Sequence, residues 1–500
     1  MATTSGSGTL PTVVIVGAGA AGIFTAYQLN QQFPGKYDIR LFEAAPQIGG
    51  NVSSVYTPYG GQTYVIDAGA QFFSPKAQPN YVNLIQTLGL SDVTPSYPAG
   101  ITIWESATDR RLLWVPATIG GFSSYTLEDW ARLVEFGAFF VASALLNAQD
   151  PPDWSLTVDD WLNGLGLMTE DFKQNVVKNF LYQFVSLPYA SIGQASALYA
   201  ITYFVRNVIG GPPPAAGAAQ SIGDYPTFQT SQSLIGLLGI LEATLTASGV
   251  TAQTSSPVTS VAPGPTGVTV TVNGSETIEA QYVVMACDPG TSATLLSSGG
   301  AANPALVTLL QGLGNQYLDL TVVMQQNGSC WMPGQTNYWE AVNTLVDTRK
   351  QTVAFSAWFG PLRPPYDGNQ PIPVFKSWGA PNLDPASCSF QFFSHTHDVL
   401  LPYVSFVQNR DSLVSYQGQN GLFFAGGWTN WFDSQEAALM SAMNIAQWLK
   451  GGPAPSASQV SRVPGASETS ANVKSWLEMV GRQAPSSHQG KIGELVKRLA

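Results

Sequence analysis

Three glycines near the N-terminus, Gly17, Gly19 and Gly22, have the spacing of a loop that binds a pyrophosphate. The first glycine allows a tight turn, the second lets the backbone approach the phosphates, and the third lets a helix pack close to the preceding strand. Glu43 follows the last of them by about 20 residues, the distance expected for an acid that binds a ribose hydroxyl. These residue types at this spacing predict a dinucleotide site.

The elements on both sides of the glycines must position them. Residues 13–16 are an apolar run, typical of a strand buried on both faces. We expect a helix over about residues 20–33, whose free N–H groups and positive dipole end face the phosphates. A second strand over residues 39–42 leads to Glu43. The alternative is a glycine-rich turn without a ligand, which does not explain why Glu43 occurs at this distance.

Composition narrows the class of protein. A length of 500 residues suggests about three domains, although two interleaved domains also fit. Charged residues make up 11% of the chain, which is low against the typical ~25%, and hydrophobic residues make up 45%. Such a chain should bury much surface, in a homo-oligomer interface, an apolar substrate tunnel or a membrane-facing patch. The net charge of −11 argues against nucleic acid and against electrostatic binding to anionic lipid.

Metal sites and targeting segments are not expected. Cys287, Cys330 and Cys388 fit neither a metal spacing nor a disulfide framework, and three histidines leave little for a His-based site. The N-terminus lacks the basic and apolar regions of a signal peptide. The longest apolar helix candidate, residues 136–146, is shorter than the ~20 residues that a bilayer requires. We expect a soluble, cytoplasmic protein without a transmembrane segment.

Further motifs identify a family resemblance. Gly49 and Gly50 follow the acid and allow close backbone approach to a ligand, and a D-x-G strand end begins at Asp67. Near the other end of the chain, a strand over residues 422–425 meets Gly-Gly, and a helix follows that Asp433 or Ser434 could cap. In this order, the motifs resemble those of the FAD-dependent amine oxidase and phytoene desaturase superfamily.

The resemblance implies an α/β fold, in which a Rossmann-type FAD-binding domain is interleaved with an α+β substrate domain. We expect residues 10–90, 225–300 and 416–451 in the FAD-binding domain, and residues 91–224 and 301–415 in the substrate domain. Residues 452–500 are expected to be a linker and a weakly ordered tail, in which residues 473–481 and 492–499 could form short amphipathic helices. A segment that docks a partner subunit is the alternative.

The resemblance also implies the cofactor contacts. Residues after the D-x-G strand would lie beside the flavin ring, although strand-end core is an equal alternative for them. The backbone of Val258 would contact the adenine, and the last helix would point its N-terminus at the flavin pyrimidine. The expected FAD-binding residues are Gly17, Gly19, Ala20, Ala21, Gly22, Glu43, Ala44, Gly49, Gly50, Asn51, Ala70, Gln71, Phe72, Val258, Gly426, Gly427, Gln435 and Ala437.

Two departures from the family pattern bear on how the cofactor is held. The family usually has an acid directly after the first glycine of the closing motif, where this chain has Gly427 followed by Trp428. A side-chain contact to the cofactor is therefore lost or made by another residue. The chain also lacks an S-G-G-C segment near this motif, so we expect noncovalent FAD.

Three side chains are candidates for catalysis. Lys376 lies in an otherwise uncharged stretch, and many relatives place a lysine near the flavin N5 through water; the alternative is a surface lysine with a buried stem. His395 and His397 could act as acid or base near neutral pH, or could be ordinary loop histidines.

The substrate class is less specified than the cofactor. Low charge and an aromatic-rich middle, residues 180–204, favour an apolar small molecule, although these aromatics more simply form a helical core. Hydride removal by an oxidase, dehydrogenase or desaturase competes with redox-neutral isomerisation of a double bond, with amine or amino-acid oxidation, and with a non-enzymatic flavin-binding role. No second fingerprint for a nicotinamide cofactor is visible, which favours molecular oxygen, a quinone or the substrate itself as electron partner.

Overall fold

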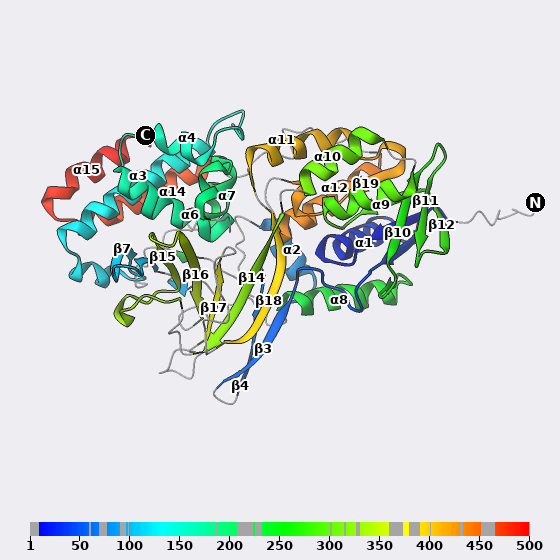
Figure 1. The fold of residues 1–500 in the computed structure, drawn as a ribbon, viewed down its shortest axis with the longest axis horizontal. Helices are drawn as coiled ribbons and strands as arrows, with labels where there is room; N and C mark the ends of the chain where they lie inside the picture. The colour runs from blue at the N-terminus through cyan, green and yellow to red at the C-terminus, as the bar shows by residue number, and fades with distance from the viewer. Residues whose placement is uncertain are drawn as a thin grey trace, which may run out of the picture. The chain divides into compact units, whose positions relative to one another are not determined.

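The chain folds into two compact units, and each unit is assembled from three separate stretches of sequence (Figure 1). Unit 1 comprises Met1–Ser53, Leu234–Asn315 and Asn409–Ser461, and unit 2 comprises Ser54–Ser233, Gln316–Gln408 and Arg462–Ala500. This computed structural model describes residues 10–59, 62–69, 78–90, 97–98, 100–185, 189–207, 224–225, 233–300, 303–314, 317–326, 331–359, 374–379, 391–400, 402–430, 434–451 and 466–499.

The unit boundaries differ from the expected domain boundaries most at two places, and by smaller shifts of the boundaries near residues 225–233, 301–315, 409–415 and 452–461. Residues 54–90, expected in the FAD-binding domain, cluster with unit 2, because a hairpin of β3 (Ser54–Tyr59) and β4 (Gln62–Asp67) leaves the parallel sheet after the second glycine turn. Residues 462–500 also belong to unit 2. The mixed α/β class and the interleaved order of segments are as expected.

A five-stranded parallel sheet forms the centre of unit 1. Its strand order is β19-β13-β1-β2-β9, and all four pairings are parallel. Val13, Val14 and Ile15 are fully buried, as expected for a central strand covered on both faces. The strands are β1 (Thr12–Val16), β2 (Asp38–Phe42), β9 (Ala252–Gln253), β13 (Tyr282–Met285) and β19 (Leu422–Phe424).

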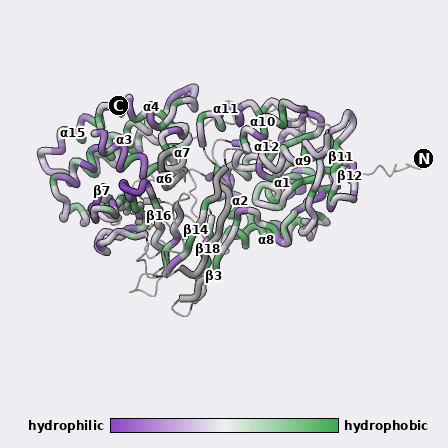
Figure 2. Tube along the Cα trace, in the orientation of Figure 1, coloured by the Kyte–Doolittle hydropathy of each residue, from purple (hydrophilic) through white to green (hydrophobic). Residues whose placement is uncertain are grey.

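Helices and a small second sheet complete unit 1. The predicted first helix is confirmed as α1 (Ala20–Gln32), which packs against α12 (Gln435–Leu449). Figure 2 shows apolar residues along α1 and along α8 (Ser233–Ala247). The remaining elements are α9 (Pro289–Gly299), α10 (Pro304–Gly314) and the antiparallel strands β10 (Val258–Pro263), β11 (Val268–Val272) and β12 (Glu276–Ala280).

Unit 2 is built on a seven-stranded sheet with the order β18-β14-β17-β16-β15-β6-β7. All its pairings are antiparallel except the parallel pairing of β15 with β6. The strands are β6 (Ile101–Glu105), β7 (Arg110–Val115), β14 (Tyr317–Gln326), β15 (Val342–Asp347), β16 (Thr352–Trp358), β17 (Val374–Gly379) and β18 (Gln391–Leu400).

An aromatic helical core accompanies this sheet. Phe180 and Tyr182 of α6 (Lys178–Val185) are fully buried, and Phe180 contacts Phe136 and Phe139 edge-on. The core is formed by α6 with α3 (Leu127–Asn147) and α7 (Ala197–Asn207). The burial of these side chains agrees with the interpretation of residues 180–204 as a helical core.

The expectation of a weakly ordered C-terminal tail is wrong. The tail forms α14 (Ala466–Gln483) and α15 (Ser486–Lys497), which pack against α3. Leu477 is 1% exposed, and its Cδ2 would lie 2.9 Å from a Cβ placed on Gly137. Apolar residues at helical spacing therefore find a partner surface on α3, which composition alone did not reveal. None of the helices in the described stretches is long and apolar enough to cross a bilayer.

Candidate active site

The first and third glycines of the fingerprint shape the turn after β1. Gly17 has φ of 102°, and its N–H donates to the Phe42 carbonyl at 2.8 Å. A Cβ on Gly22 would collide with the Gly17 carbonyl oxygen, so α1 approaches the strand more closely than any side chain would allow. These are the turn and packing roles that the spacing predicts.

The second glycine meets the other glycine turn of unit 1. Gly19 and Gly49 form a β-bridge, and the Gly49 N–H donates to the Ala18 carbonyl at 3.0 Å. A Cβ on Gly19 would find its nearest neighbours at 3.7 Å, so the protein itself leaves space there. In the described structure no side chain caps α1, and its first turn contains no acid. Unfilled space beside an uncapped helix N-terminus fits a pyrophosphate.

Glu43 links this turn to the chain that precedes Val258. Its two carboxylate oxygens accept the N–H groups of Ala18 at 2.7 Å and Ala45 at 2.8 Å. Its own carbonyl accepts the Ser256 N–H at 2.8 Å. Each carboxylate oxygen has two lone pairs, so the half-buried carboxylate keeps acceptor capacity for ribose hydroxyls. Among the other expected contacts nearby, Ala44 and Asn51 are exposed.

The closing motif lies at the same edge of the sheet. β19 pairs with β13, which pairs with β1, so the carboxyl ends that carry Gly426 and Gly17 are two strands apart. Gly426 has φ of 149°, and a Cβ there would lie 2.5 Å from the Trp428 indole nitrogen. Gly427 begins a buried 3-10 turn that also contains Trp428 and Thr429. A ligand site at the carboxyl ends of neighbouring parallel strands follows the rule for such sheets.

The predicted cap of the last helix is confirmed at Ser434, whose Oγ accepts the Ala437 N–H at 3.2 Å. Asp433, the other candidate, lies outside the described residues. Ala437 is fully buried and its N–H is already bonded, whereas Gln435 is half-buried in the first turn. Of these two expected contacts, the geometry therefore favours Gln435.

Lys376 lies on β17 of unit 2 and is 4% exposed, which excludes the surface-lysine interpretation. Its Nζ donates to the backbone carbonyls of Asp67 at 2.8 Å and Gly69 at 2.6 Å. Burial lowers the pKa of Lys376 to about 7, and the charge of Asp67 opposes that shift. The lysine therefore combines a pKa near neutrality with direct contact to the D-x-G strand end.

The sheet around Lys376 carries a second row of buried polar groups. Because side chains alternate along a strand, Ser377 faces away from Lys376. Its Oγ accepts the Gln325 amide N–H at 2.9 Å and forms a hydrogen bond with the Ser356 hydroxyl. The Ser356 hydroxyl lies 2.9 Å from the Trp331 carbonyl oxygen. Sequence reasoning missed this row, because serines and glutamines on separate strands give no signal before the register is known.

The remaining sequence candidates are only partly visible. His395 and His397 lie on β18, where His395 pairs with Val322 of β14 in the backbone register, and Val322 also pairs with Trp378 of β17. Their side chains lie outside the described part of the structure, as do residues 70–72, which include the expected contacts Ala70, Gln71 and Phe72.

Three further ionisable side chains withdrawn from water, one in unit 2 and two in unit 1, were missed. Glu340 accepts the Trp114 indole N–H at 2.7 Å, and burial raises its pKa to about 7. Arg410 and Glu436 are each 1% exposed. Neither gave a signal in the sequence, because Arg410 in FVQNRDSL and Glu436, two residues after the Ser434 cap, are charged residues of the kind that usually lie at the surface.

Comparison with protein families and sequences gives one match. A family model described as "flavin containing amine oxidoreductase" matches residues 20–365, more than half of the chain. No curated protein sequence matches.

Solved structures of similar fold include two amine oxidases and one isomerase. Cyclohexylamine oxidase from Brevibacterium oxydans IH-35A has a TM-score of 0.56 and 16% identity, covering 88% of this chain and 99% of that chain. Putrescine oxidase bound to putrescine has a TM-score of 0.59 and 14% identity, with 88% and 99% coverage. A CLA-producing fatty acid isomerase from P. acnes has a TM-score of 0.57 and 12% identity, with 88% and 98% coverage. At these identities the likeness shows the fold.

Proposed function

Because this chain belongs to the family of flavin-containing amine oxidoreductases and is an FAD-dependent oxidoreductase, we propose that unit 1 binds FAD noncovalently and that a largely apolar small molecule is the substrate. One observation carries the cofactor assignment: Gly19 meets the Gly49–Gly50 turn beside the uncapped N-terminus of α1. That arrangement leaves backbone N–H groups and unfilled space where a pyrophosphate requires both.

The other residues of unit 1 extend this site. Glu43 would accept the ribose hydroxyls with the lone pairs that Ala18 and Ala45 leave free. Gln435, in the first turn of α12, would face the flavin pyrimidine, where the positive end of a helix dipole stabilises negative charge. Bound FAD supplies the hydride acceptor at its N5 atom.

Lys376 is the best-supported candidate for acid–base chemistry. A pKa of about 7 lets one amine both take up and release a proton near neutral pH. Its hydrogen bonds to Asp67 and Gly69 fix the ammonium against the D-x-G strand end. His395 and His397 stay candidates by their place on the neighbouring part of the same sheet.

An apolar substrate is supported by the 11% charged residues of the chain. Amine oxidation is the second candidate, favoured by the description of the matching family. Redox-neutral isomerisation of an unsaturated fatty acid or polyene is the third, since a fatty acid isomerase shares the fold. Molecular oxygen would be the electron acceptor in the first two cases and would not be consumed in the third.

The test first examines how the cofactor is bound and then how ligand affinity depends on alkyl chain length. Acid precipitation of the purified protein should release all yellow colour into the supernatant if FAD is noncovalent. Flavin absorbance is then titrated with saturated fatty acids and with alkylamines of increasing length. Burial of each CH₂ contributes ~0.8 kcal/mol, so affinity should tighten about three- to fourfold per methylene.

Two outcomes would change the assignment. A flat response to chain length, with strong dependence on a charged amine head group, would replace the apolar substrate by a polar amine. Turnover of a polyene without oxygen uptake would change the assigned activity from oxidase to isomerase.

A further inference from the structure

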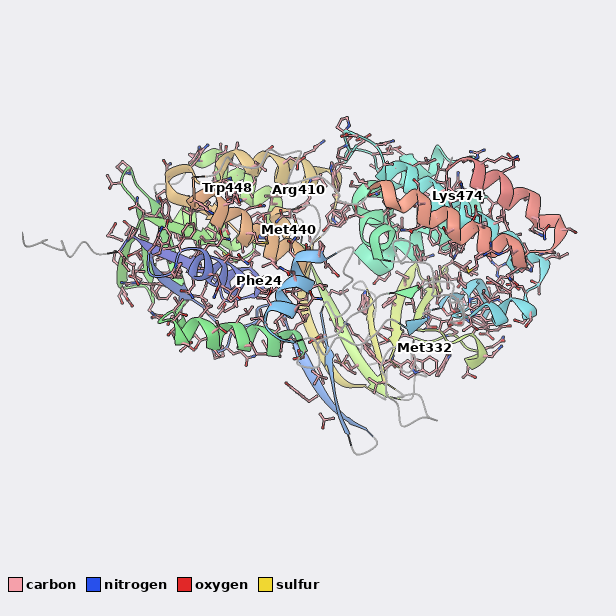
Figure 3. The ribbon with its side chains drawn as sticks, turned by 180° about the vertical axis from the view of Figure 1, so that it is seen from behind. Phe24, Met332, Arg410, Met440, Trp448 and Lys474 are labelled. Atoms are coloured by element: carbon pink, nitrogen blue, oxygen red, sulfur yellow. The ribbon has the colours of Figure 1, made fainter. Side chains whose placement is uncertain are left out.

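Arg410 is a buried cation that the proposed chemistry does not use. It lies on α11 (Val404–Leu413), and its side chain is 0% exposed. Its Nε and one terminal nitrogen donate to Asp411 Oδ1 at 3.1 and 2.9 Å, and the other terminal nitrogen donates to the Asn430 carbonyl at 3.0 Å. Figure 3 labels Arg410 on α11 and Met440 on α12, both within unit 1.

The Asn430 contact connects Arg410 to the closing motif. The Asn430 side-chain amide donates to the Ala437 carbonyl at 2.8 Å, in the first turn of α12. At the other end of the same turn, the Gly426 N–H donates to the Ser441 hydroxyl at 3.0 Å. The turn from Gly426 to Asn430 is thus held to α12 at both ends, and Arg410 holds it from α11.

Unit 1 contains a second buried charged residue, of opposite sign. In the described part of unit 1, the buried charged residues are Arg410 and Glu436, and Glu436 lies in the first turn of α12. When ionised, a carboxylate there disfavours electrons arriving at that helix end, since charges in a low-dielectric interior interact strongly. Asp411, the ion-pair partner of Arg410, is 35% exposed, so solvent screens its negative charge more than the buried guanidinium.

We propose that Arg410 is a positioning residue for the redox end of the flavin: it fixes the Gly426–Asn430 turn and supplies the positive charge that offsets Glu436 when the flavin is reduced. The inference rests on the proposed binding of FAD by unit 1. It explains how a closing motif with glycine at the usual acid position still presents a fixed, electropositive helix end.

The test compares three variants of the FAD-loaded enzyme. Arg410→Met removes the charge and the hydrogen bonds, Arg410→Lys keeps the charge, and Leu310→Ala opens a cavity on α10 of unit 1 without touching either. For each, the FAD dissociation constant, the melting temperature and the flavin midpoint potential are measured. Arg410→Met should make flavin reduction about tenfold less favourable, which is ~30 mV for a two-electron couple.

The two other variants separate charge from stability. Arg410→Lys should bind FAD more weakly. Its midpoint potential should correspond to less than a threefold change in the equilibrium constant for flavin reduction. Leu310→Ala should lower the melting temperature and leave the potential unchanged. An unchanged potential in Arg410→Met would overturn the proposal, and so would a tenfold change in Arg410→Lys. If Arg410→Met does not fold, Arg410→Gln and Arg410→Lys are compared on the same criterion.

Failure of the inference is distinct from failure of the proposed function. A wild-type protein that binds no FAD would remove both. A wild-type protein that binds FAD, with a potential insensitive to the charge at residue 410, would leave FAD binding in place and remove only the role of Arg410.

Discussion

The candidate cofactor site of unit 1 is formed mostly by backbone atoms, whereas the catalytic candidate of unit 2 is a buried titratable side chain. In unit 1, a Cβ on Gly17 or Gly49 would crowd neighbouring atoms, and Gly19 leaves space beside the Gly49 turn. In unit 2, Lys376 and Glu340 are titratable groups withdrawn from water, and burial moves both pKa values to about 7. The two kinds of site should therefore respond differently to mutation and to pH.

The difference has a physical reason. Main-chain N–H groups do not titrate near neutral pH, so a site made from them keeps its electrostatics across the working range. A buried ammonium or carboxylate stays charged only at a cost, and small environmental changes alter its protonation. Unit 1 is suited to holding a cofactor at constant affinity, and unit 2 is suited to exchanging protons.

The largest effect is expected from a substitution in the backbone-lined cofactor site of unit 1. Gly19→Val should abolish FAD binding, because the protein leaves space at Gly19 and the valine side chain would fill it. Flavin absorbance of the purified variant measures the loss. The melting temperature of the apoprotein should change little, since a Cβ at this position has no neighbour closer than 3.7 Å.

Gly22→Ala is the matched control, because its Cβ would collide with the Gly17 carbonyl oxygen. This variant should lower the melting temperature of the apoprotein itself. A Gly19→Val protein that stays fully yellow, or two variants with the same melting temperature, would show that the glycines do not divide these roles.

The second prediction concerns Lys376 and the pH dependence of stability. Its folded-state pKa of about 7 lies below the ordinary 10.5, so the unfolded chain binds more protons between these values. Stability contributed by this group therefore rises with pH from about 7 to 10.5, by up to about 1.4 kcal/mol per pH unit. Lys376→Met should remove that slope, and thermal melts of both proteins from pH 6 to pH 9.5 measure it.

A matched variant on the opposite face of the strand separates charge from packing. Ser377→Ala disturbs the buried hydroxyl row but leaves the ammonium in place, so its melting temperature should fall equally at every pH. Parallel pH profiles for wild type and Lys376→Met would contradict a buried lysine with a lowered pKa.

The contrast between the units also explains what the sequence could predict. The glycine spacing, the acid and the capped helix at Ser434 are local patterns, and the structure has each in its predicted element. The meeting of Gly19 with Gly49 and the burial of Lys376 depend on which segments pair, which spacing along one strand does not encode. The packing of the C-terminal helices was missed for the same reason, because their partner surface lies on α3.

A third prediction tests whether the stability contributed by Glu340 changes with pH in the opposite direction to that contributed by Lys376. Burial raises the pKa of Glu340 from 4.5 to about 7, so the folded state binds the extra proton and stability falls as pH rises through that range. Glu340→Gln keeps an oxygen that can accept the Trp114 N–H. The melting temperature of this variant relative to wild type should therefore increase from pH 5 to pH 8. A constant difference would mean that Glu340 does not titrate in this window.

The smallest effect is expected from a substitution at the N-terminus of α12 in unit 1. Ser434→Ala removes the hydroxyl that accepts the Ala437 N–H and should cost about 1 kcal/mol of unfolding free energy. Thr126→Ala is the matched control in unit 2, because Thr126 caps α3 through the Asp129 N–H in the same way. Both variants should lose similar stability, but only Ser434→Ala should change the midpoint potential of bound flavin, since α12 carries the redox end of the proposed site. Equal potentials in the two variants, at equal cost in stability, would place the N-terminus of α12 away from the flavin.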